Sequence, residues 1–305
     1  MRCTSTDNCH SMGQGNNSLS INNSGRMKNP KVKKMKNMTT RTMEPSKGLA
    51  LLDQAVAEGR DFIDPSWVIQ RAEISKQAAN DLLLRLVHSG LLERVSHGKY
   101  AVRPLGVLGV PVAADDVGVA VAALFEGVLH RLAYRSALDY YGLLTRPVRT
   151  VQVASSKRIR QDEISDRPLH VILESERTVL VGAAPLKHGS HVSGLERALL
   201  DAASRPNLVG GIETVVEALS LAPSIKPARL RSLANQLSAR RGLRRLGSLL
   251  DQLGQNELAN SLYRPGFRHP IELEPKAGTE VQFVDDKWRV LWNVDRVSVL
   301  GAATQ

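Results

Sequence analysis

The apolar positions between residues 47 and 90 recur at intervals of three and four, the spacing of amphipathic helices. The first predicted helix runs from Lys47 to Ala57. The second begins at Asp64-Pro65, where a capping side chain precedes a proline in the first helical position. Ser75 caps a third helix, which ends at Gly90. The residues of its predicted apolar face are Ala78, Ala79, Leu82, Leu86 and Val87.

Two short extended runs follow the helices, Leu91 to Val95 and Tyr100 to Arg103, and the turn between them contains Gly98. This pattern predicts a β-hairpin. Helix, helix, short turn, helix and hairpin is the order of a winged helix-turn-helix, so we predict such a domain over residues 47–104.

In this fold the third helix enters the major groove, where Asn and Gln pair with adenine and Lys pairs with guanine, while the wing lies beside phosphates. The predicted DNA contacts are Ser75, Lys76, Gln77, Asn80 and Arg85 on the third helix, and Arg94, His97 and Lys99 on the wing. A winged helix that docks a partner protein is the alternative interpretation.

Helical and strand-like patterns alternate irregularly in a second predicted domain, residues 112–299. A helix is predicted from Asp115 to Gly142. The predicted strands are Thr150 to Ala154, Leu169 to Leu173, Thr178 to Val181, Val281 to Val284 and Arg289 to Val294. The further predicted helices are Leu195 to Ser204, Gly211 to Leu221, Pro227 to Ala239 and Leu243 to Leu253. The predicted fold class is therefore α+β, with a winged helix-turn-helix at the N-terminus and a larger mixed domain after it.

The charge of the chain is unevenly distributed. The 305 residues carry a formal net charge of +11, and residues 1–46 alone contribute eight basic residues against two acidic ones. This segment has no apolar periodicity, so we predict a disordered basic tail. It is either a plain extension, a result of a translation start set too far upstream, or an arm that contacts DNA phosphates. Both cysteines, Cys3 and Cys9, lie in it, which favours a cytoplasmic protein; no stretch is apolar enough for a membrane span.

Arginines gather in and between two of the later predicted helices, and they are Arg229, Arg231, Arg240, Arg241, Arg244 and Arg245. A solvated helical face is one interpretation. A surface that contacts DNA phosphates, or an acidic partner, is the other, and for DNA we select Arg240, Arg241, Arg244 and Arg245.

The second domain shows no sequence motif for catalysis, a metal or a cofactor, and we predict none of the three. His188 and His191 are three residues apart, but no obvious third ligand accompanies them, and solvated loop histidines are favoured. Glu196 and Asp201 could form a carboxylate pair in an enzyme that acts on nucleic acid. An Arg197–Asp201 ion pair four residues apart on a helix is the favoured interpretation of the same residues.

Several segments resemble the AbiEi family, the antitoxins of AbiE-type abortive-infection toxin-antitoxin systems. Residues 90–94 and 98–100 resemble its N-terminal domain, residues 134–143 resemble its segment with Ser-Ala-Leu and His-Gly-Leu, and residues 193–201 resemble its Glu-Arg-Thr-Leu-Leu-Asp element. Tyr141 and Ala198 depart from the family pattern, where His and Thr are usual.

The resemblance implies a promoter-binding repressor that recognises inverted repeats and counteracts a nucleotidyltransferase-like toxin without a stable toxin complex. Paired half-sites would require a dimer or cooperative assembly on double-stranded DNA.

Overall fold

The computed structural model describes residues 47–96, 98–103, 115–164, 167–186, 189–275, 277–278 and 280–304. The predicted disordered tail, residues 1–46, lies outside the described residues, as do His97 and His188.

The three helices predicted near the N-terminus are confirmed as α1 (Lys47–Ala57), α2 (Pro65–Ala72) and α3 (Lys76–His88). The capping side chains act as predicted: Asp64 accepts a hydrogen bond of 2.9 Å from the backbone N–H of Trp67, and Ser75 accepts one of 3.3 Å from that of Ala78. After α3, Gly90 takes a left-handed conformation with φ of 72°, which ends the helix without steric cost.

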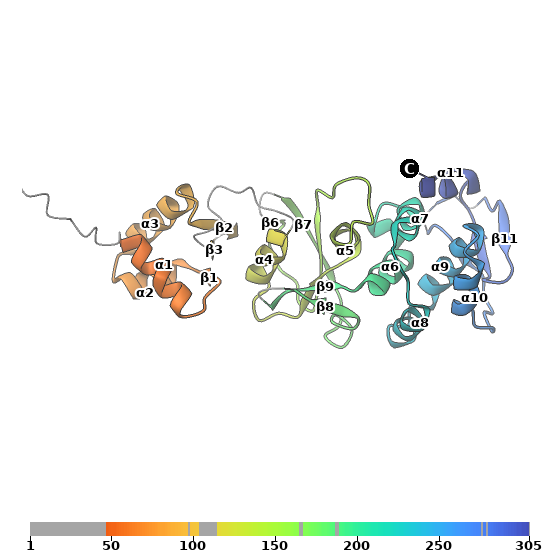
Figure 1. Ribbon diagram of the computed structural model, residues 1–305, viewed down its shortest axis with the longest axis horizontal. Helices are drawn as coiled ribbons and strands as arrows, with labels where there is room; N and C mark the ends of the chain where they lie inside the picture. Colours follow the sequence, from red (N-terminus) through yellow and green to blue (C-terminus); the bar gives the residue numbers. More distant parts are fainter. Residues whose placement is uncertain are drawn as a thin grey trace, which may run out of the picture. The chain divides into compact units, whose positions relative to one another are not determined.

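The predicted hairpin is β2 (Leu92–Ser96) with β3 (Lys99–Val102). A third strand, β1 (Phe62–Ile63), pairs antiparallel with β3, so the order in this sheet is β1-β3-β2 (Figure 1). A strand of two residues is too short to show an alternating pattern, which explains why the sequence did not predict it. The order α1-β1-α2-α3-β2-β3 is the one expected of a winged helix.

The rest of the described chain is mixed, and the α+β class is confirmed. Its helices are α4 (Asp115–Leu124), α5 (Tyr134–Tyr140), α6 (Leu195–Ser204), α7 (Ile212–Leu221), α8 (Pro227–Gln236), α9 (Arg240–Gln252), α10 (Asn256–Leu262) and α11 (Arg296–Gly301), with 3₁₀ turns η3 (Pro206–Leu208) and η4 (Ala302–Thr304). Its strands are β4 (His130–Leu132), β5 (Val151–Ser155), β6 (Glu163–Ile164), β7 (Arg167–Leu173), β8 (Ala183–Pro185), β9 (His191–Ser193), β10 (Ile271–Glu272), β11 (Phe283–Asp285) and β12 (Val290–Trp292).

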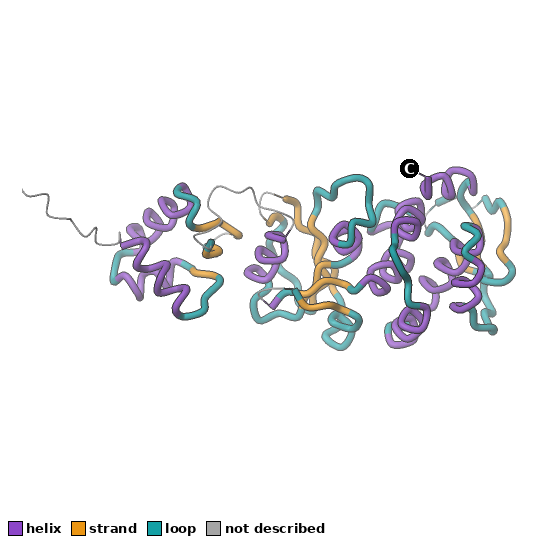
Figure 2. The backbone as a smooth tube through the Cα atoms, in the orientation of Figure 1, coloured by secondary structure: helices purple, strands orange, loops and turns teal. Residues whose placement is uncertain are grey.

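A six-stranded mixed sheet has the order β6-β7-β5-β4-β9-β8. Strand β5 runs parallel to β7 and antiparallel to β4, and β4 runs parallel to β9. Helices α5 and α6 pack on this sheet, α9 packs on α6, and β12 of the small sheet β10-β12-β11 packs on α9 (Figure 2). Most of the apolar side chains in these layers belong to one buried cluster, whereas α1–α3 and their sheet enclose a second.

Two sequence predictions in this region are wrong. The helix from Asp115 does not continue to Gly142: α4 ends at Leu124, Gly127 takes a φ of 71°, and residues 130–132 form strand β4. All three residues of β4 are buried, and a short run buried on both faces cannot be distinguished from a helix by its spacing. Residues 178–181 form a turn instead of the predicted strand, because Gly182, with φ of 73°, reverses the chain before β8.

No helix among the described residues is long and apolar enough to cross a membrane.

Candidate nucleic-acid interface

Helix α3 has one buried face and one polar, exposed face. Ala79, Leu83 and Leu86 are buried against the rest of the N-terminal helices. The predicted DNA contacts of α3 are all exposed, and they are Ser75, Lys76, Gln77, Asn80 and Arg85. The structure therefore leaves these side chains exposed to solvent, on the part of the helix that does not pack against the core.

Asp81, Leu84 and His88 also lie on the exposed side of α3. Arg85 donates from Nε to the backbone carbonyl of Asp81, at 3.3 Å, and not to its carboxylate. Leu84 is 45% exposed, which the sequence pattern had not led us to expect. The signal was present, since a helix that buries only one face turns at least one of three consecutive side chains, here Leu82, Leu83 and Leu84, away from that face.

Glu58, which directly follows α1, contacts two side chains of α2, Trp67 and Arg71. Its carboxylate accepts hydrogen bonds from Arg60 Nε at 2.9 Å and from Trp67 Nε1 at 3.3 Å, and it forms an ion pair with Arg71 at 2.6 Å. The hydrogen bond from Arg60 is the main cause that lowers the pKa of Glu58 below its ordinary value. Glu58 thereby fixes the end of α1 to α2, on which α3 packs.

Of the two predicted wing contacts that the structure describes, Arg94 and Lys99, one differs from its prediction. Arg94 is exposed on β2. Lys99, predicted beside DNA phosphates, instead donates from Nζ to the carbonyl of Ala123 at 2.8 Å and to the carboxylate of Glu126 at 2.7 Å. The carboxylate of Glu126, two residues after the end of α4, attracts the ammonium group of Lys99. Lys99 therefore has a partner within the chain and does not extend from the wing as predicted.

The arginine cluster divides into exposed and buried members. Arg240 and Arg241 are exposed at the start of α9. Arg244 and Arg245 are only 7% and 4% exposed, so the prediction that they contact DNA phosphates is wrong. Sequence spacing missed this because the apolar face of α9 is wider than its leucines alone indicate.

Both buried arginines bind backbone carbonyl groups. Arg244 Nε donates to the carbonyl of Trp288 at 2.8 Å, and Arg245 Nε donates to that of Glu272 at 2.9 Å. Burial lowers the pKa of Arg244, and it lowers that of Arg245 to about 10. These two side chains tie α9 to the segments around β10 and β12.

The two remaining members of the cluster also have partners inside the protein. Arg229 lies 3.5 Å from the carboxylate of Glu196, and Arg231 donates to the backbone carbonyl of Ser261. Arg240 and Arg241 are thus the exposed members of the cluster that form no ion pair among the described residues, whereas Arg229 is exposed but lies beside Glu196.

The carboxylates of α6 have structural partners. Asp201 forms ion pairs with Arg197 at 2.7 Å, as favoured from the sequence, and with Arg131 at 2.8 Å. Glu196 accepts a hydrogen bond of 3.1 Å from the backbone N–H of Lys226. Asp201 neutralises two arginines, and Glu196 accepts a hydrogen bond from a backbone N–H on a different element. These separate structural contacts argue against a catalytic carboxylate pair.

The proposed histidine pair falls partly outside the described residues. His191 lies in β9, but His188 is one of the residues that the structure does not describe. Within the described part of the chain, no group of three His, Cys, Asp or Glu side chains could hold a metal ion.

Comparison with known proteins matches residues 127–252 to the family model of the AbiEi antitoxin C-terminal domain. No curated protein matches the chain. Among solved structures, the fold is similar to the RV2827C protein from Mycobacterium tuberculosis, with a TM-score of 0.56 and 18% sequence identity. That similarity covers 85% of this chain and 94% of the other, and at this identity it concerns the fold alone.

Proposed function

We propose, from the match of residues 127–252 to the AbiEi antitoxin C-terminal domain, that the chain acts as an antitoxin of this type and that it also represses its own operon by binding promoter DNA through α3. In this proposal the protein binds inverted repeats in double-stranded DNA. It counteracts a nucleotidyltransferase-like toxin, and the two activities use different parts of the chain.

The exposed polar face of α3 is the observation that carries the DNA-binding half of the proposal. Lys76, Gln77 and Asn80 lie in the first two turns of the helix, whose capping residue Ser75 is itself exposed. These side chains suit guanine and adenine edges in the major groove, and a helix N-terminus attracts phosphate. Leu84, on the same exposed side, suits contact with a thymine methyl group.

Arg240 and Arg241 are proposed to add phosphate contacts that do not depend on sequence. Both are exposed and, unlike Arg229, form no ion pair with a carboxylate among the described residues; the positive charge of an exposed arginine contributes to affinity by releasing counterions from DNA.

Fluorescence anisotropy with the upstream region of the operon tests the proposal. Replacing Lys76, Gln77 and Asn80 by Ala should reduce the preference for this DNA over unrelated DNA, since each good base contact contributes about 1–3 kcal/mol of discrimination. Gln54→Ala, an exposed glutamine on α1, is the matched control and should bind as the unmodified protein does. An unmodified protein that binds all DNA equally would refute the repressor proposal.

A second arm of the experiment separates exposed from buried arginines. Replacing Arg240 and Arg241 by Gln should weaken binding to every DNA alike. It should also reduce the slope of log affinity against log salt by about 0.9 for each phosphate that is no longer neutralised. Arg244→Gln and Arg245→Gln should instead lower the thermal stability, because both side chains are buried on backbone carbonyl groups.

The antitoxin half of the proposal concerns how the toxin is counteracted. We propose that no stable complex forms, so the purified toxin and this protein should elute separately in size-exclusion chromatography. Co-expression should nevertheless restore growth, and the α3 triple variant should restore it equally well from a heterologous promoter. A stoichiometric co-eluting complex would contradict this part, and it would leave the DNA-binding part intact.

Paired half-sites imply two copies of the protein on one operator. We propose a dimer or cooperative assembly on DNA, which analytical ultracentrifugation with and without the operator fragment distinguishes from a single bound copy.

A further inference from the structure

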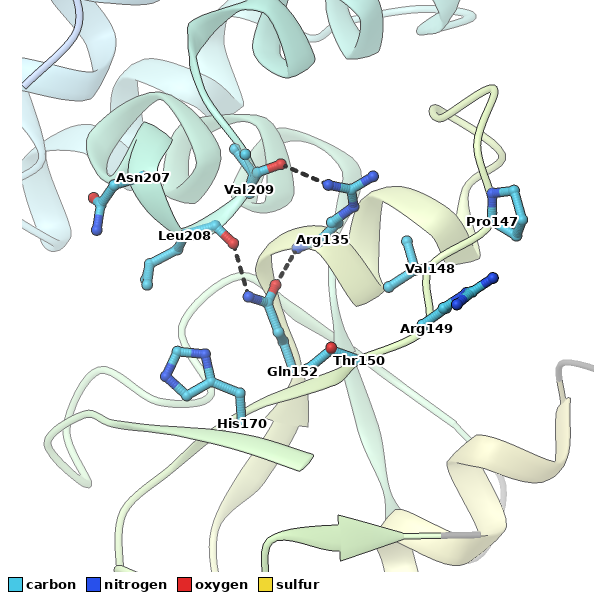
Figure 3. Close-up of a pocket in the computed structure, with 11 residues that line it drawn as sticks. Arg135, Pro147, Val148, Arg149, Thr150, Gln152, His170, Asn207, Leu208 and Val209 are labelled. Carbon is cyan, nitrogen blue, oxygen red and sulfur yellow. Dashed lines mark hydrogen bonds between the residues drawn. The ribbon is translucent and has the colours of Figure 1, made fainter. Parts of the chain in front are cut away.

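An open pocket of about 490 Å³ lies on one face of the six-stranded sheet, at the ends of α5 and η3 (Figure 3). Its floor is formed by Thr150 and Gln152 of the β5 segment and by His170 of β7. Arg135 of α5 and Arg149, just before β5, line the sides. None of these residues belongs to the proposed DNA-binding face.

The geometry of the floor follows from the strand register. Gln152 and His170 are paired across the parallel strands β5 and β7, so their side chains lie on the same face of the sheet. Gln152 is buried, and its amide is held at both ends: Oε1 accepts from the backbone N–H of Arg135 at 2.8 Å, and Nε2 donates to the carbonyl of Leu208 at 2.7 Å. Figure 3 shows that Gln152 thereby joins the floor to two walls of the pocket.

The lining of the pocket carries the positive charge of two arginines. It contains Arg135, Arg149 and His170, and it contains no aspartate or glutamate. Arg135 donates from Nη1 to the carbonyl of Val209 at 3.3 Å, which orients its guanidinium group at the rim. Among the described residues, no carboxylate forms an ion pair with Arg135 or Arg149, and His170 is exposed on the floor.

Two neighbouring charges complete the electrostatics. Arg167 donates from Nε to the carbonyl of Arg149 at 3.2 Å, which adds a further positive charge beside the wall. Asp139 lies near Arg135 and Arg167 and outside the lining; burial raises the pKa of its carboxyl, although both arginines oppose that shift. The pocket is consequently a concave region in which cationic groups outnumber anionic ones.

We propose that this pocket binds a phosphate-bearing ligand of about nucleotide size, and that the lining groups Arg135, Arg149 and His170 recognise its phosphate. Guanidinium groups bind phosphate through paired, charge-assisted hydrogen bonds. A lone phosphate would fill only part of the volume, which falls within the range of small-molecule sites, about 300–1,000 Å³. The lining holds no Phe, Tyr or Trp on which a base could stack, so the phosphate and not the base provides recognition.

Isothermal titration calorimetry at constant ionic strength tests the proposal with three probes: AMP, inorganic phosphate and adenosine. We expect AMP to bind, inorganic phosphate to compete with it, and adenosine not to bind. Replacing Arg149 and His170 by Ala should weaken AMP binding by about tenfold or more, the effect of losing a hydrogen bond to a charged group. Both side chains are exposed, so the variant should fold normally, which its thermal unfolding checks.

The matched control is Arg177→Ala, which removes an exposed arginine outside the pocket lining and should not change AMP affinity. Absence of AMP binding by the unmodified protein at millimolar concentration would overturn the proposal. Equal losses in the control and pocket variants would overturn it too, because they would indicate general charge attraction. The pocket variant should bind operator DNA normally, so this proposal and the repressor proposal fail separately.

Discussion

Arg131 is fully buried, and its guanidinium group is neutralised by two carboxylates. It forms a two-point contact with Glu174, with both bonds at 2.9 Å, and a bond of 2.8 Å with Asp201. Burial alone would lower the pKa of Arg131, but Asp201 and Glu174 more than offset it and raise that pKa. Arg197 contacts the same two carboxylates, so β4, α6 and the segment after β7 depend on one ionic network.

Asp201→Asn should therefore destabilise the fold strongly. The substitution keeps the size of the side chain but removes one of two charges that compensate two buried guanidinium groups, and breaking such a pair costs about 3–5 kcal/mol. Urea unfolding measures the change, with Glu176→Gln, an exposed glutamate, as control. A loss no larger than in the control would show that the network is not needed for stability.

His130 predicts how stability depends on pH. Burial lowers the pKa of its imidazole below the ordinary value of 6.5, and Nδ1 donates a hydrogen bond of 2.7 Å to the carbonyl of Val128. As the pH falls below 6.5, His130 takes up a proton in the unfolded chain before it does so in the folded protein. The contribution of neutral, buried His130 to the stability of the fold is therefore complete above pH 6.5 and is lost as the pH falls below it.

We expect the unfolding temperature to fall between pH 7.5 and 5.5, and to fall less in His130→Asn, whose amide can still donate to Val128. Differential scanning calorimetry at several pH values measures both slopes. His88→Gln, on the exposed side of α3, serves as the control. Parallel pH profiles for the unmodified protein and His130→Asn would contradict the assignment.

Local signals predicted much of the helical structure. The capping residues Asp64 and Ser75, and the left-handed Gly90, placed α2 and α3 correctly because each acts on its own helix. The polar face of α3 was evident for the same reason. In contrast, β4 is three residues long and its place in the sheet depends on β5 and β9, which are distant in sequence. Arg244 and Arg245 look solvated until β10 and β12 cover them, and the pocket around Gln152 requires strand register, which periodicity does not provide.

Close packing at the element scale leads to a prediction for α9. A methyl group added to Gly247 would overlap the indole ring of Trp288, which is fully buried and donates from Nε1 to Asp251 at 2.6 Å. Gly247→Ala should therefore cost about 1–3 kcal/mol, although alanine favours helices by about 1 kcal/mol over glycine.

Gly301→Ala is the matched control, since this glycine lies in α11 and its added methyl would meet no atom within 4 Å. Denaturant unfolding should show opposite signs for the two substitutions. Stabilisation by both would mean that Trp288 moves away without cost, which its enclosed position argues against.

At the scale of the whole molecule, the net charge of +11 does not by itself indicate where DNA binds. Eight of the basic residues lie in residues 1–46, while several arginines of the second half are occupied by carboxylates or carbonyl groups. Charge that contacts phosphates changes affinity and its salt dependence, whereas sequence preference requires groups that reach base edges. If the protein binds DNA as proposed, the basic tail and α3 should therefore have separable effects.

Replacing the five tail lysines by Gln tests the separation in the full-length chain; they are Lys28, Lys31, Lys33, Lys34 and Lys36. We expect the ratio of affinities for operator and unrelated DNA to stay constant, because α3 is unchanged. If the tail contacts phosphates, the salt slope should fall by up to about 4.5, at 0.9 for each lysine; an unchanged slope would identify a plain extension. A collapse of the affinity ratio would contradict the assignment of sequence reading to α3, since phosphate contacts carry no direct sequence information.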